Sequence, residues 1–161
     1  MKKLVLLAIL GSVVVASVWS ARRTEQPAET DSRLLSDRIW IDHIPRNERD
    51  TIHVFLALSE VSIGVFQATS QWRGNFEGFR YEASGNELRM VFPQTGDREA
   101  VRTKARRCTE QQMDFCLELD GTSRGAKKYY SREGWEIDRH ADLDAVKRRV
   151  ETLRGQLTAG H

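Results

Sequence analysis

An alternation of apolar and polar residues runs from Asp37 to Ile137, and turn residues (Gly, Asn, Asp and Pro) interrupt it at short intervals. This pattern is typical of short antiparallel strands and limits the region to an all-β fold. A long meander leaves exposed edges unless it closes on itself. We therefore predict an eight-stranded antiparallel up-and-down barrel. Its strands are expected at residues 38–44, 51–59, 62–72, 76–83, 88–94, 99–107, 114–120 and 126–132.

The turns predict the registers of two successive hairpins in this region. A turn at residues 85–86 pairs Tyr81 with Met90, since two-residue turns of this composition favour hairpins. A turn centred on residues 96–97 pairs Met90 with Thr103. The same face of the middle strand points inward in both hairpins, so the two registers are consistent.

The side chains predicted to point inward are largely apolar, while the orientation of the third strand stays open because both its faces are apolar. The predicted inward set is Ile52, Val54, Leu56, Leu58, Phe79, Tyr81, Leu88, Met90, Phe92, Val101, Thr103, Phe115, Leu117 and Leu119. Eight strands enclose a space that either fills with side chains or admits one small ligand. The candidate ligand contacts are Phe79, Tyr81, Met90, Phe92, Thr103 and Leu117.

The chain has two cysteines, Cys108 and Cys116, at the start and end of the segment CTEQQMDFC. In an exported protein two cysteines typically form a disulfide. A zinc site would need further ligands and a redox pair would need closer spacing, so these roles are the weaker alternatives. Placing Cys108 opposite Cys116 puts both on the polar outward face and sets Arg106 opposite Glu118. The disulfide would then staple this hairpin in register.

The N-terminus has the layout of a secretory signal: two lysines, an uncharged and mostly apolar run at residues 4–19, and a small residue, Ser20, at the expected cut. The run is shorter than the ~20 residues of a membrane-spanning helix. Two arginines that follow it also fit an uncleaved anchor in the inner membrane. We interpret residues 1–20 as a signal peptide or anchor and predict export to the periplasm or beyond.

Charge offers no evidence for a nucleic-acid partner. Removing residues 1–20 takes away two lysines and no acids, which leaves equal numbers of basic and acidic residues. Acids are predicted opposite the basic stripe at residues 102–106, so this stripe is expected to be a solvated, internally paired face. Contact with a membrane is expected only through an uncleaved N-terminal segment.

Two segments flank the predicted barrel domain at residues 37–137. Residues 21–36 are polar and without periodicity, as in a flexible tether. Residues 138–161 are predicted to form an amphipathic helix and tail, with Asp142 as a possible cap. A helix of this length is marginal alone, so its apolar seam must rest on the barrel or on a protein partner. The seam comprises Leu143, Val146, Val150, Leu153 and Leu157.

Trp40 in DRIWID and Arg132 in YYSREGW occupy the places of two residues that close lipocalin barrels. Residues 37–157 thus resemble the lipocalin-like, or calycin, class of barrels. The resemblance implies that Trp40 and Arg132 pack together at the barrel closure and that the barrel holds a small ligand. Arg38 stands where lipocalins have a glycine. A more distant likeness is to the barrel-shaped chromophore lyases of phycobiliprotein assembly, whose longer motifs are absent.

The sequence carries no GxSxG, HExxH, P-loop or GxGxxG motif, and we expect no catalytic residues, metal site or cofactor. The leading hypothesis is an exported, non-enzymatic barrel that binds a small apolar ligand. The alternative is an envelope interaction or assembly module with a filled barrel and a partner-binding helix. A chromophore-lyase-like barrel is the more remote possibility.

Overall fold

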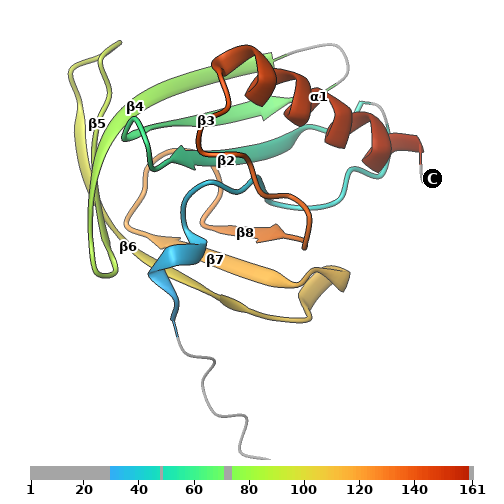
Figure 1. Cartoon of the computed structure of the whole chain (residues 1–161), viewed down its shortest axis with the longest axis horizontal. Coiled ribbons are helices and arrows are strands. Elements are labelled where there is room, and N and C mark those ends of the chain that lie inside the picture. The colour runs from blue at the N-terminus through green and yellow to red at the C-terminus, as the bar shows by residue number, and fades with distance from the viewer. Residues whose placement is uncertain (1–29, 48, 71–73, 160–161) are drawn as a thin grey trace, which may run out of the picture.

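A computed structural model describes residues 30–47, 49–70 and 74–159 of the chain. The segment 1–20 and most of the predicted tether lie outside the described residues. The fold is one closed antiparallel barrel with strands in chain order, followed by a single C-terminal helix (Figure 1). The strands are β1 (Trp40–Ile41), β2 (Ile52–Leu58), β3 (Ile63–Thr69), β4 (Gly74–Ser84), β5 (Glu87–Val91), β6 (Arg98–Arg107), β7 (Phe115–Asp120) and β8 (Lys128–Ser131).

This architecture confirms the predicted fold class. The barrel closes where β1 pairs with β8 through Ile41 and Tyr130. The predicted β4–β5 register is also confirmed, because Tyr81 is paired with Met90. Turn chemistry explains this success: Gly85 has a φ of 59°, a conformation that glycine adopts without steric cost.

The predicted β5–β6 register was wrong. Met90 pairs with Glu99 rather than with Thr103, because the connecting turn lies further back along the chain. Phe92 donates its backbone N–H to the carbonyl of Asp97 at 2.9 Å and thereby closes a loop of residues 93–96. The shift is an even number of residues, so every side chain keeps its predicted face.

The disulfide is confirmed, but the predicted register of the hairpin that carries it was wrong. Cys108 and Cys116 are bonded with their Cα atoms 5.7 Å apart. Arg106, and not Cys108, is the register partner of Cys116. Cys116 lies on the outer side of β7 yet is fully buried in an apolar cluster, so it does not belong to a polar face.

The orientation predicted for β2 was also wrong. Phe55 and Ala57 belong to the cluster inside the barrel. The residues predicted to point inward lie instead in a second apolar cluster on the outside; they are Ile52, Val54, Leu56 and Leu58. Both faces of β2 are apolar, so alternation groups its residues without saying which group points in. On β3, Phe66 points inward and Ile63 and Val65 pack outside.

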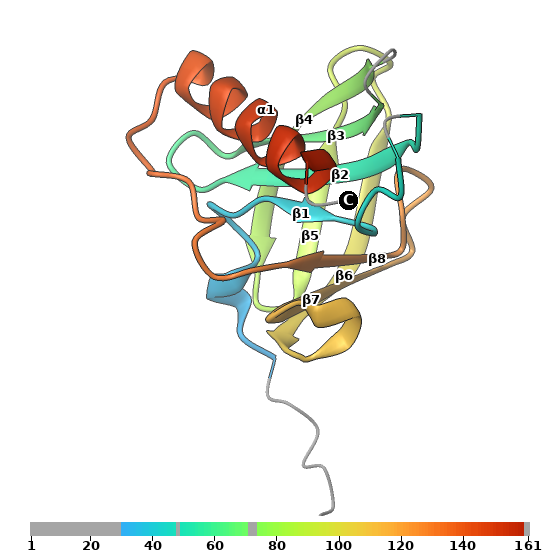
Figure 2. The same cartoon turned by 90° about the vertical axis from the view of Figure 1, so that its right-hand side faces the viewer.

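Helix α1 (Leu143–Ala159) explains why β2 is apolar on both sides, because it lies across the outer face of the strands near the barrel closure (Figure 2). The Asp142 carboxylate accepts a hydrogen bond from the Ala145 N–H and caps the helix, as predicted. Val146 and Leu153 are buried in the outer cluster, and Val150 and Leu157 pack against it. The side chain of Leu143 lies outside the described part of the structure.

Candidate functional site

Aromatic side chains fill the centre of the barrel. Phe79 has ring neighbours on several strands: its centroid lies 5.2 Å from that of Phe66, 5.7 Å from that of Phe92 and 6.0 Å from that of Phe55. Tyr129 joins the group through Phe55 at 5.8 Å. The interior, as far as the described residues define it, is therefore occupied by its own rings.

The six candidate ligand contacts lie together in this interior. Their side chains come from β4, β5, β6 and β7, or from the residue directly after β5, and none is more than 8 % exposed. They are Phe79, Tyr81, Met90, Phe92, Thr103 and Leu117. Sequence reasoning thus placed these residues correctly on one inner surface, although that surface is packed.

A short N-terminal helix, η1 (Ser32–Leu34), lies at one end of the barrel beside β6. Leu35, which follows it, is buried, and its carbonyl accepts a hydrogen bond from the indole N–H of Trp40 at 3.1 Å. The Tyr81 hydroxyl lies 3.5 Å from that of Ser36, and burial raises the pKa of this tyrosine. We call this end of the barrel, where η1 lies, the N-terminal end.

The Arg38 side chain contacts several segments where the barrel closes. Its guanidinium lies 4.0 Å from the centroid of the Phe115 ring and donates to the carbonyl of Arg132 at 2.8 Å. It also pairs with Glu136 beyond β8. Burial lowers the pKa of Arg38 despite this partner. Arg132 is half-buried, and its Nε has no hydrogen-bond partner among the described residues.

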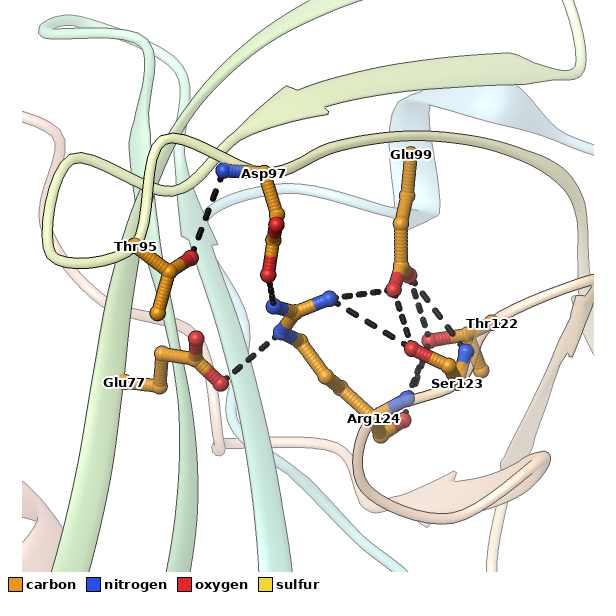
Figure 3. A network of polar contacts seen from close by, with 7 residues as sticks. All are labelled: Glu77, Thr95, Asp97, Glu99, Thr122, Ser123 and Arg124. Carbon is orange, nitrogen blue, oxygen red and sulfur yellow. Dashed lines mark hydrogen bonds and ion pairs between the residues drawn. The ribbon is translucent and has the colours of Figure 1, made fainter.

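The opposite end carries a network of charges centred on Arg124, in the loop between β7 and β8 (Figure 3). The Arg124 guanidinium donates to Glu77 at 2.9 Å and to Asp97 at 2.7 Å, and it also bonds Glu99. It lies 3.8 Å from the centroid of the Phe92 ring. The arginine thereby holds its loop against the aromatic interior. We call this end of the barrel the loop end.

These groups hold one another in their charged forms. The bond with Glu77 raises the pKa of Arg124, and the bond with Arg124 lowers that of Asp97. Burial opposes ionisation of Glu99, but hydrogen bonds from Ser123 and Arg124 outweigh it and lower the Glu99 pKa. All three guanidinium nitrogens of Arg124 thus donate to partners within the chain, so the network holds the loop between β7 and β8 in place.

Sequence reasoning missed this network. Glu77 precedes Phe79 by two residues and Glu99 precedes Val101 by two, so alternation already placed both acids on the inner face. Arg124 belongs to an irregular loop, where no periodicity indicates the direction of a side chain. Only the acidic residues of the network were therefore indicated by the alternation pattern in the sequence.

The outer face of β4, β5 and β6 carries a groove of about 840 Å³. One row of register partners crosses its floor: Arg80 on β4, Val91 on β5 and Arg98 on β6. Val91 is 39 % exposed, and Val61 at the groove is 56 % exposed. The groove is lined by Val61, Ser62, Arg80, Tyr81, Glu82, Arg89, Met90, Val91, Arg98, Glu99 and Ala100.

Within the described ranges, no group of three or more His, Cys, Asp and Glu side chains could hold a metal ion. In the same part of the chain, no helix has the length and apolar character needed to cross a bilayer. Among the described residues, we therefore take the groove as the candidate binding site.

Fold and surface together define a class: an eight-stranded up-and-down β-barrel with aromatic rings packed in its interior and, among the described residues, an exposed groove with arginines on its outer face. This architecture is compatible with a lipocalin-like fold. No family model matches the chain, and searches of curated proteins and of solved structures find no significant match.

Proposed function

We propose that this protein is an exported interaction module, a filled barrel that binds a partner through the outer face of β4, β5 and β6. The observation that carries the proposal is the row Arg80–Val91–Arg98, which leaves an apolar side chain exposed between two cations in a groove. The outer face of β1 and β2, by contrast, is buried under α1. Exposed apolar side chains gathered in a groove are typical of interaction sites.

Two further observations support export. The apolar run at residues 4–19 has the layout of a signal or anchor. The Cys108–Cys116 disulfide is typical of an oxidising compartment.

A small apolar ligand is supported less well, because Phe55, Phe66, Phe79 and Phe92 already occupy the centre of the barrel. The same packing leaves little room for the pigment that a chromophore-lyase-like barrel would handle. The apolar seam of α1 rests on the barrel through Val146 and Leu153, which makes the helix a weaker candidate for a partner surface.

Site-specific photo-crosslinking in the organism that makes the protein tests this proposal. A benzophenone side chain at Val91 is expected to give one discrete crosslinked product, whereas the same group at exposed Lys147 on α1 gives none. Native mass spectrometry of the exported protein should show no retained small molecule. A crosslink from Lys147 alone, or a ligand retained stoichiometrically, would overturn the proposed function.

A further inference from the structure

Resting on the proposed function, we propose that the groove binds an extended acidic segment of a partner protein. Carboxylates of this segment meet Arg80 and Arg98, and an apolar side chain between them contacts Val91. The pattern that fits is acidic–x–apolar–x–acidic.

The charge of the groove favours an anion. Within the described ranges, Arg80 and Arg98 form no ion pair, and both are exposed. Arg89, which also lines the groove, is neutralised by Glu87 at 2.6 Å. Glu82 contributes one negative charge to the same wall, and the other acid of the lining, Glu99, is paired with Arg124. As far as the described residues show, two unpaired guanidinium groups therefore remain, and arginine is well suited to binding carboxylates with paired hydrogen bonds.

The spacing favours an extended chain. Neighbouring strands lie about 4.8 Å apart, which puts the Cα atoms of Arg80 and Arg98 about 10 Å apart with Val91 midway. Alternate residues of an extended segment lie about 7 Å apart and point to the same side. Consider an extended segment that crosses the strands with an apolar residue over Val91. An acid two positions before this residue then reaches one arginine, and an acid two positions after it reaches the other.

The apolar side chains and the shape argue against other polyanions. A phosphate polymer or an acidic polysaccharide would leave Val61 and Val91 without an apolar partner. The site is also hollow, with a volume of about 840 Å³, and the surface of a bilayer is flat. An acidic peptide with an apolar residue matches the charge, the valines and the concavity together.

The test is fluorescence anisotropy with a fluorescein-labelled peptide, GESLSEG, titrated with the exported protein at low salt. We expect saturable binding that weakens at least tenfold for GQSLSQG and at least threefold for GESSSEG. Binding should also weaken at least tenfold in Arg80→Gln/Arg98→Gln. The control Lys147→Gln/Arg148→Gln removes the same charge from the exposed face of α1 and should bind within twofold of the parent. Circular dichroism and the unfolding midpoint verify that both double variants are folded.

Three results would overturn this inference. The first is that the peptide fails to bind at millimolar protein. The second is that both double variants lose affinity equally. The third is that vesicles containing phosphatidylglycerol bind through Arg80 and Arg98 while the peptide does not. If any of these occurs and the crosslink from Val91 persists, the proposed function stands and only the acidic-segment class fails. Loss of the Val91 crosslink with intact peptide binding would instead count against the proposed function.

Discussion

At each end of this barrel, a side chain bonds a connecting segment to the strands. Arg124 covers the Phe92 ring at the loop end and bonds three carboxylates, those of Glu77, Asp97 and Glu99. Trp40 bonds the carbonyl of Leu35 at the N-terminal end. The bonds of Arg124 join segments far apart in the chain, whereas Trp40 and Leu35 are five residues apart.

Replacing Arg124 tests the closure at the loop end. Arg124→Met keeps apolar contact with Phe92 but removes every charged hydrogen bond, and we expect a loss of about 2 kcal/mol in the free energy of unfolding at pH 7. Urea denaturation measures it. Arg148→Met, on the exposed face of α1, is the matched control and should change stability by less than about 0.5 kcal/mol. An equal loss in both variants would show that the network contributes nothing.

The stability of Arg124→Met should fall less than that of the parent protein as the pH is lowered. The pKa of Asp97 and of Glu99 is lower in the folded chain than its ordinary value, 3.8 and 4.5. The unfolded chain therefore binds more protons as the pH falls, so the stabilisation is fully present above about pH 5 and is lost as the pH falls through the lowered pKa values. The stability difference between parent and Arg124→Met should narrow from pH 7 to pH 3. A constant difference would contradict the assignment.

Two glycines give opposite expectations for the same substitution. A Cβ at Gly64 would lie 2.6 Å from the carbonyl oxygen of Leu56 and 2.2 Å from the Phe79 ring, whereas one at Gly155 meets nothing within 4 Å. We expect Gly64→Ala to destabilise by about 2 kcal/mol or more through overpacking. Gly155→Ala, inside α1, should stabilise by about 0.5–1 kcal/mol. Thermal unfolding of both variants measures this, and similar midpoints would refute the packing at Gly64.

At the scale of elements, two features attach secondary structure to the barrel. The disulfide links the end of β6 to β7 next to the loop that contains η2 (Glu110–Gln112). Helix α1 covers the outer cluster near the closure of the barrel. Each can be removed without touching the interior, so each has its own stability test.

Removing the disulfide should cost about 2–3 kcal/mol, because the unfolded chain regains the freedom of the short loop that the bond closes. The double variant Cys108→Ala/Cys116→Ala and the reduced parent protein should show this same loss in urea denaturation. Adding reductant to the double variant is the control and should have no effect. A loss below about 0.5 kcal/mol would mean that the hairpin is held without the bond.

Truncating the helix seam should cost more than changing its exposed face. Leu153 is 5 % exposed within the outer cluster, so Leu153→Ala is expected to lose about 2–4 kcal/mol by leaving a cavity. Lys147→Ala is the exposed control and should stay within about 0.5 kcal/mol of the parent. If Leu153→Ala unfolds like the parent, the helix does not depend on this contact.

The positions of the strands could be predicted from the sequence because alternation is a local signal. Registers and faces are set by longer-range contacts: the loop at residues 93–96 shifts β5 against β6, and α1 decides which side of β2 points out. The candidate groove was not predictable, because the predicted register did not place Arg98 beside Val91. Arg124 was not predicted for a different reason: its loop has no periodicity that would indicate the direction of a side chain.

At the scale of the whole molecule, two parts of the barrel's outer surface differ. The part over β1 and β2 is buried under α1, and the part over β4, β5 and β6 carries the groove with Arg80, Val91 and Arg98. Between them lies an interior packed with aromatic rings and closed at the loop end by Arg124. The packed interior thus supports the face that carries the groove.

This organisation depends on the barrel having no room for a guest, and a titration with cis-parinaric acid tests that most directly. Energy transfer from tryptophan to this apolar probe reports binding inside the barrel, where Trp40 is fully buried. We predict no saturable energy transfer at any probe concentration below the one at which the probe aggregates. Saturable, stoichiometric transfer that oleate reverses would contradict the account, because it would mean that the rings of Phe55, Phe79 and Phe92 yield to a ligand.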